Sequence, residues 1–292
     1  MNGAWRARNA TGRSVPRRLL PPSTTSTTSC ALQRDLLPTA RPAKPYALLA
    51  RHLSRRRGDR EIVPRGHRSS LGEQEPREAL MILYCVRHGE STFNVEGRLQ
   101  GQSNEPRLSP LGLKHAQALL ATLGQLEIDA IYSSPLARAR ETAQPLADAL
   151  RLPVQCDDRL KEIDIGVFQG TLAAELGDRF PQEAARWRSQ DPDYRIPGGE
   201  SRRDLMQRAE AAFQAIHAAG HAQVAVVAHG GVLAAALKAL IGVPAERNPF
   251  MLYNGSISMI EWTSQIKLMT LNQIDHLRAA GCALATRTGD LA

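Results

Sequence analysis

Cysteine is scarce and scattered in this chain. Four of the 292 residues are cysteines, at positions 30, 85, 156 and 282, and no two of them form a Cys-x-x-Cys pair. This spacing argues against a disulfide framework and against a thiolate metal site. Cys85 is instead expected to be a core residue of a strand. We therefore expect no metal and no other cofactor at the functional site.

Long apolar runs and phosphate-cradling glycine motifs are missing as well. No stretch approaches the roughly 20 apolar residues of a membrane span, and the N-terminus lacks the apolar centre of a secretory signal. The chain contains no Gly-x-Gly-x-x-Gly motif and no P-loop, which disfavours nucleotide binding. These absences predict a cytoplasmic protein without a membrane partner.

Positive charge is confined to one end of the chain. Residues 1–80 carry 16 Lys and Arg against 6 Asp and Glu, whereas the remainder carries 21 against 23. The folded part is thus nearly neutral, and we expect no nucleic-acid partner. Residues 1–80 also contain a Pro/Ser/Thr tract and little apolar periodicity, which predicts a disordered leader. Both a targeting segment and an upstream start-site artefact fit this leader.

From Met81 onwards, short apolar runs alternate with longer amphipathic stretches. This alternation predicts an α/β fold, a three-layer sandwich whose mostly parallel central sheet has helices on both faces. We assign residues 81–277 to this domain and residues 278–292 to a short flexible tail. The strands are expected at 81–86, 130–133, 153–156, 224–228, 256–262 and 266–271.

Helix starts are marked by Ser-Pro pairs and by Ser201. Ser109-Pro110 and Ser134-Pro135 each place an N-capping hydroxyl before a proline at the first helical position. Ser201 is expected to cap a later long helix, and a further helix is expected over 231–240. The irregular segment 171–197 is predicted to form a small cap excursion over the pocket.

Two histidines follow directly on apolar runs. Arg87-His88-Gly89 comes after Met81–Val86, and His229-Gly230-Gly231 comes after Val224–Ala228. In open α/β sheets the carboxyl ends of parallel strands meet at one crevice, so we expect a shared pocket. A neutral imidazole can attack phosphorus and form a phosphohistidine. His88 is therefore the candidate nucleophile.

A phosphomonoester is a dianion, which calls for fixed cationic and polar donors. The planar fork of arginine suits phosphate oxygens best, and Arg87 and Arg138 fill this need. His229 is expected to be protonated and to stabilise the transferring phosphoryl group, with the backbone amide of Gly230 as a neutral donor. Glu162 is the candidate general acid, and Glu90 and Asp164 are competing carboxyls.

Four separated motifs resemble the histidine phosphatase superfamily, also called the phosphoglycerate mutase-like superfamily. They are residues 87–94, residues 134–142, Glu162 and residues 228–230. The resemblance runs from about Met81 to about His276. It implies that His88 is phosphorylated and that Glu162 donates the proton. It further implies phosphate contacts by a set of polar side chains: Arg87, Asn94, Arg138 and His229.

Within that superfamily, the segment Glu162–Gly170 resembles the phosphatase branch, and the excursion is shorter than in the mutases. We therefore expect hydrolysis of a small phosphorylated metabolite. A 2,3-bisphosphoglycerate-dependent phosphoglycerate mutase and a non-catalytic phosphate-binding module stay open as alternatives. A homodimer through an exposed sheet edge is a further expectation.

Several other side chains are expected to be exposed: His115, Arg140, Arg179, Arg186, Arg188 and Arg195. The last four could alternatively contact an anionic substrate.

Overall fold

The computed structural model describes residues 80–282. The predicted leader, except for its last residue, and positions 283–292 of the predicted tail lie outside the described residues. The division of the chain into leader, domain and tail therefore stays a prediction. In the described part, no helix combines the length and the apolar character needed to cross a membrane.

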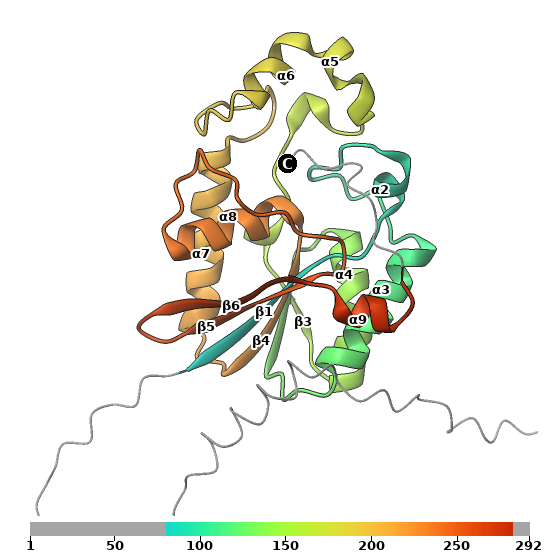
Figure 1. The fold of residues 1–292 in the computed structure, drawn as a ribbon, viewed down its shortest axis with the longest axis vertical. Helices are drawn as coiled ribbons and strands as arrows, with labels where there is room; N and C mark the ends of the chain where they lie inside the picture. Colours follow the sequence, from blue (N-terminus) through green and yellow to red (C-terminus); the bar gives the residue numbers. More distant parts are fainter. Residues whose placement is uncertain (1–79, 283–292) are drawn as a thin grey trace, which may run out of the picture. The chain divides into compact units, whose positions relative to one another are not determined.

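A six-stranded sheet forms the centre of residues 80–282 (Figure 1). Its strands are β1 (Met81–Arg87), β2 (Ala130–Ser133), β3 (Val154–Cys156), β4 (Gln223–Ala228), β5 (Ile257–Trp262) and β6 (Ile266–Gln273). The spatial order is β3-β2-β4-β1-β5-β6. The first four strands of this order are parallel, and β5 and β6 extend the sheet in antiparallel fashion. The predicted mostly parallel sheet is confirmed.

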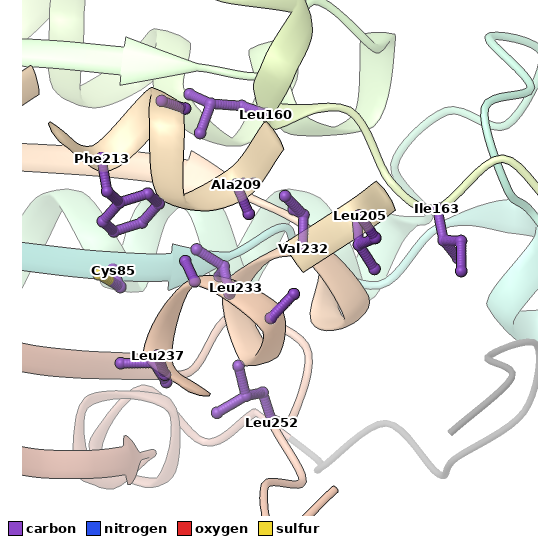
Figure 2. Packing of buried hydrophobic residues seen from close by; sticks show 14 of the residues in the cluster. Cys85, Leu160, Ile163, Leu205, Ala209, Phe213, Val232, Leu233, Leu237 and Leu252 are labelled. Carbon is purple, nitrogen blue, oxygen red and sulfur yellow. The ribbon is translucent and has the colours of Figure 1, made fainter. Parts of the chain in front are cut away.

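Helices cover both faces of the sheet, as predicted for a three-layer fold. The side chains of β1 alternate between two buried clusters, because successive residues of a strand point to opposite faces. Leu83 and Cys85 pack with α7 (Arg202–Ala218) and α8 (Gly230–Ile241), a cluster shown in Figure 2. Tyr84 and Val86 pack on the other face with α3 (Pro110–Leu123) and α4 (Ala137–Leu150).

One of the two Ser-Pro helix starts is confirmed and the other is wrong. Ser109 caps α3, its hydroxyl accepts a hydrogen bond from the Gly112 amide, and Pro110 is the first helical residue. Helix α4 instead begins at Ala137, with Leu136 as N-cap and no capping side chain. The Ser134 hydroxyl lies 2.8 Å from Nε2 of His229 and accepts a hydrogen bond from the Leu136 amide at 3.3 Å, so it contacts the histidine and the residue before the helix but caps no helical amide.

Residues 171–197, here called the cap, are more regular than expected. They contain a 3-10 turn, η3 (Ala173–Glu175), and two short helices, α5 (Leu176–Arg179) and α6 (Pro181–Arg188). Figure 1 shows α5 and α6, in yellow, together beyond one end of the sheet. Leu176 and Trp187 bury their side chains in the same cluster as α7 and α8. The cap is therefore anchored to the core by apolar contacts.

The remaining short elements connect the layers. They are α2 (Thr92–Glu96), the 3-10 turns η1 (Asp158–Leu160) and η2 (Gly166–Phe168), and α9 (Asp275–Ala279). Helix α9 crosses the boundary that we expected after Leu277. Leu277 and Cys282 are both buried in a small cluster with Ala118 of α3.

Candidate active site

The pairing of β1 with β4 brings the two histidines together. Arg87 lies opposite Ala228 in this parallel register, so the next residues along the chain, His88 and His229, leave the sheet side by side. Their ring centroids are 5.1 Å apart, in an edge-on arrangement. Both side chains are buried. The shared pocket expected from the two strand ends is thus present.

His88 is held in one tautomer by its neighbour. Nδ1 lies 2.7 Å from the carbonyl oxygen of Gly89, which can only accept a hydrogen bond, so Nδ1 carries the proton. Nε2 consequently keeps its lone pair. Burial, together with the charges of Arg138 and Arg87, lowers the pKa of His88 well below its usual value. The imidazole is therefore neutral and suited to nucleophilic attack.

Arg87 and Arg138 supply the cationic groups of the site. Arg138 is fully buried and donates from Nη1 to the Ser103 carbonyl and from Nη2 to the Gly101 carbonyl, both at 2.8 Å. Nη1 of Arg87 donates to the carbonyl oxygen of Leu252. Backbone carbonyls thus hold both guanidinium groups in place. Planar guanidinium groups suit the oxygens of a dianion such as a phosphate.

Glu162 lies at the N-terminal end of α8. One carboxylate oxygen accepts hydrogen bonds from the amides of Ile163 (2.8 Å) and Val232 (3.1 Å), and the other accepts from Gly231 (2.9 Å). A Cβ atom at Gly231 would collide with Oε1 of Glu162, so only glycine leaves room for the carboxylate there. Arg208 of α7 donates to the Glu162 carbonyl at 2.9 Å and so also fixes the backbone of this segment.

These groups surround a cavity of about 330 Å³. Its wall includes five of the predicted site residues: Arg87, His88, Arg138, Glu162 and Gly230. His229 is not part of the wall, and its ring is in edge-on contact with that of His88. The competing carboxyls Glu90 and Asp164 do not line the cavity. Glu90 accepts a hydrogen bond from the Ser109 hydroxyl, and Asp164 accepts one from the Gly166 amide.

Asn94 has a different place from the one expected. Asn94 is the third residue of α2 and forms a capping box with Ser91. Its Oδ1 accepts hydrogen bonds from the Ser91 amide and from Nδ2 of Asn254. Asn94 is absent from the cavity wall, whereas Asn254 is part of it. Nδ2 of Asn254 also donates to the His88 carbonyl at 3.2 Å. Asn94 thus supports the loop that carries His88.

The expectation of a protonated His229 does not agree with its surroundings. Burial contributes most, followed by the charges of Arg138 and neighbouring groups, and together they lower the pKa of His229 well below its usual value. The protein's own groups therefore favour a neutral imidazole. The negative charge of a bound anion would oppose this effect.

Other sequence expectations met different outcomes. Arg140 and the four cap arginines are exposed, as expected, and none of them lines the cavity. The prediction that His115 is exposed is wrong. Its side chain is fully buried beside residues 87–94, and the Glu90 amide lies 3.4 Å from its Nδ1. Two cations in the cavity wall, Arg202 and Lys238, were missed. Lys238 stands alone in the apolar run Val232–Leu240, and that isolation was a usable signal.

Comparison with known proteins agrees with this geometry. Residues 83–273 match the model of the histidine phosphatase superfamily (branch 1). Phosphoserine phosphatase 1 of Hydrogenobacter thermophilus is 35% identical over 201 residues, which cover 68% of this chain and 95% of that protein. The protein named "Probable phosphoglycerate mutase GpmB" of Proteus mirabilis is 38% identical over 190 residues, covering 63% and 86%.

A solved structure shows the same relationship in three dimensions. The mycobacterial glucosyl-3-phosphoglycerate phosphatase superposes with a TM-score of 0.60 at 31% identity, covering 66% of this chain and 99% of that chain. The family match spans most of the described residues and includes both histidine motifs. This chain belongs to the histidine phosphatase superfamily.

Proposed function

We propose that this protein hydrolyses a small phosphomonoester through a phosphohistidine on His88. One observation carries the proposal. A neutral imidazole with a free Nε2, two buried guanidinium groups and a carboxylate share the wall of a single cavity. Arg87 and Arg138 bind the phosphoryl oxygens, and the Gly230 amide at the start of α8 adds a neutral donor.

The reaction proceeds in two displacements. Nε2 of His88 attacks phosphorus, the ester P–O bond breaks, and the leaving alkoxide takes a proton from the Glu162 carboxyl. Water then attacks the phosphohistidine and gives a proton back to Glu162, while the P–N bond breaks and phosphate leaves. His229, in edge-on contact with His88, stabilises charge on the phosphoryl group. None of these steps uses a metal.

The test is the His88→Ala variant with p-nitrophenyl phosphate as substrate. Turnover should fall about a thousandfold or more, because the group that forms the covalent intermediate is gone. His217→Ala is the matched control: His217 stacks on Trp262 at 4.4 Å, outside the cavity wall, so kcat should be retained. EDTA should leave the parent enzyme active, whereas strong inhibition by EDTA would point to a metallophosphatase.

A mutase is the second candidate, since several of the similar proteins bear that name. A mutase must hold its intermediate and exclude water. The cap arginines do not reach the cavity wall, which supports hydrolysis instead. The discriminating measurement uses 3-phosphoglycerate with a 2,3-bisphosphoglycerate primer. Formation of 2-phosphoglycerate faster than phosphate release would replace the phosphatase proposal, and phosphate binding without turnover would identify a non-catalytic module.

A further inference from the structure

Two buried cations lie in the cavity wall away from the proposed catalytic groups. Arg202 of α7 and Lys238 of α8 expose only 9% and 5% of their surface. Nζ of Lys238 donates to the Ala245 carbonyl at 3.1 Å. Nη2 of Arg202 donates to the Trp187 carbonyl at 3.0 Å, and its guanidinium carbon lies 3.3 Å from the centre of the Trp187 ring.

Neither cation forms a salt bridge within residues 80–282. No salt bridge joins Arg202 or Lys238 to a carboxylate of this part of the chain, and Nη1 of Arg202 is buried without any hydrogen-bond partner. Burial lowers the pKa of Arg202 to about 10 and outweighs the opposite effect of the Asp191 charge. Burial and the charge of Arg202 lower the pKa of Lys238 and outweigh the opposite effect of the Glu246 charge. A buried pair of like charges without a salt bridge is costly, and a bound anion would offset that cost.

Helix α8 connects these cations to the proposed catalytic centre. Gly231, Ala234, Ala235 and Lys238 all line the cavity, and their spacing of three, four and seven residues places them along one helical face. Two turns separate Gly231, beside the Glu162 carboxylate, from Lys238, which corresponds to roughly 10 Å along the axis. The two alanines leave the space between these ends open.

We propose that Arg202 and Lys238 form a second anion subsite, so that the preferred substrates are phosphomonoesters carrying another acidic group, a carboxylate or a phosphate, remote from the scissile ester. This inference rests on the proposed function, because it needs the first phosphate at His88. Trp187 contributes by holding the guanidinium of Arg202 over its ring through a cation–π contact. The subsite would therefore select substrates by their far end and leave the chemistry at phosphorus unchanged.

Three open-chain six-carbon phosphates provide the test on the full-length protein. Sorbitol 6-phosphate is neutral at its far end, 6-phosphogluconate carries a carboxylate there, and hexitol 1,6-bisphosphate carries a second phosphate. We expect kcat/KM for at least one acidic probe to exceed that for sorbitol 6-phosphate by about ten- to a hundredfold, as a charge-assisted hydrogen bond would produce. The better acidic probe identifies the group that the subsite prefers.

Arg202→Gln and Lys238→Met should each reduce this ratio toward one. Arg203→Gln is the matched control, because Arg203 is the next residue of α7, is exposed and pairs with Asp193. The ratio should be unaffected in that control. A ratio of one for both acidic probes in the parent enzyme, with all three probes hydrolysed, would overturn the subsite and leave the phosphatase proposal standing.

Failure of the proposed function has a different signature, namely no turnover of any probe. Calorimetric titration with 6-phosphogluconate then decides about the subsite alone. Weaker binding by Arg202→Gln than by the parent and by Arg203→Gln would support it. Equal binding by all three proteins would overturn it.

Discussion

At the scale of single residues, Gly231 controls the position of the proposed acid. Its amide donates to Glu162, and its lack of a side chain makes space for the same carboxylate. A catalytic carboxyl contributes typically a hundred- to ten-thousandfold to rate when it is correctly placed. A change at Gly231 therefore tests the role of Glu162 without altering its chemistry.

We predict that Gly231→Ala lowers kcat for p-nitrophenyl phosphate by about a hundredfold or more. The added methyl group would displace Oε1 of Glu162. Gly177→Ala is the control, because a Cβ atom there meets nothing nearer than the Arg188 guanidinium, at 3.7 Å. Parent-like kcat in a folded Gly231→Ala protein would show that turnover does not depend on this position of the Glu162 carboxylate.

Motif order allowed Arg87, His88, Arg138 and Glu162 to be predicted as neighbours, and all four line one cavity. The convergence of strand ends accounts for Arg87 and His88. The places of Arg138 and Glu162, on a helix and in a loop, followed from the family resemblance alone. His115 was predictable in principle. It shares the buried face of α3 with Gly112, Ala116 and Leu119, at spacings of three and four residues. The prediction failed because histidine is polar and was therefore not counted among the buried residues of this helix. Asn94 could not be placed, because its contact with Asn254 depends on a segment distant in the sequence.

At the scale of secondary-structure elements, identical Ser-Pro signals have two different uses. Ser109 caps α3, whereas the Ser134 hydroxyl contacts His229 and leaves α4 without a capping side chain. Local sequence cannot distinguish the two serines, because the contact of Ser134 is with His229, which follows β4 and is distant in the sequence. A tertiary hydrogen bond has displaced a local preference.

We predict that Ser109→Ala lowers the free energy of unfolding by about 1 kcal/mol and retains kcat, as expected for the loss of a helix cap. Ser134→Ala should instead lower kcat about tenfold, since a hydrogen bond that orients His229 is lost. Urea unfolding and steady-state assays on both variants check the contrast. Retained kcat in Ser134→Ala would show that this contact only supports the structure.

At the scale of the whole molecule, three of the four buried histidines of residues 80–282 link stability to pH. Burial is the largest cause of the lowered pKa of His88, His229 and His276, and that of His276 falls to about 4. In the unfolded chain each imidazole binds a proton near pH 6.5. Below that pH the unfolded state therefore binds more protons than the folded state, which favours unfolding.

We predict that the free energy of unfolding decreases as the pH falls from 6.5 to 5, by up to about 1.4 kcal/mol per pH unit for each of these histidines. His276→Gln should make the dependence shallower by one such contribution, because Gln keeps a donor for the Gly255 carbonyl, which lies 2.9 Å from Nε2 of His276. Urea titrations at several pH values measure the slope. An unchanged slope in the variant would show that His276 titrates alike in both states.

The fold class was predictable because the alternation of apolar runs reports on buried parallel strands. The sequence marks Lys238 as unusual, but the pairing of Arg202 with Lys238 was not predictable, because the two share a cavity only after α7 and α8 have packed together (Figure 2 shows this layer). The charge of Arg202 also lies in the first turn of α7, where the helix dipole disfavours cations. From its local sequence alone, Arg202 would be expected at the protein surface, where water solvates its charge.

The register of β1 against β4 has a consequence for how activity arises during folding. These strands lie far apart in sequence. Bringing them together costs the chain entropy, so the pairing is expected to form slowly. A slip of one residue would turn the whole face of a strand around and separate the two imidazoles. After dilution from denaturant, enzymatic turnover should therefore return only when β1 and β4 have paired in the native register. A collapsed intermediate that has native helices but lacks this pairing would be inactive.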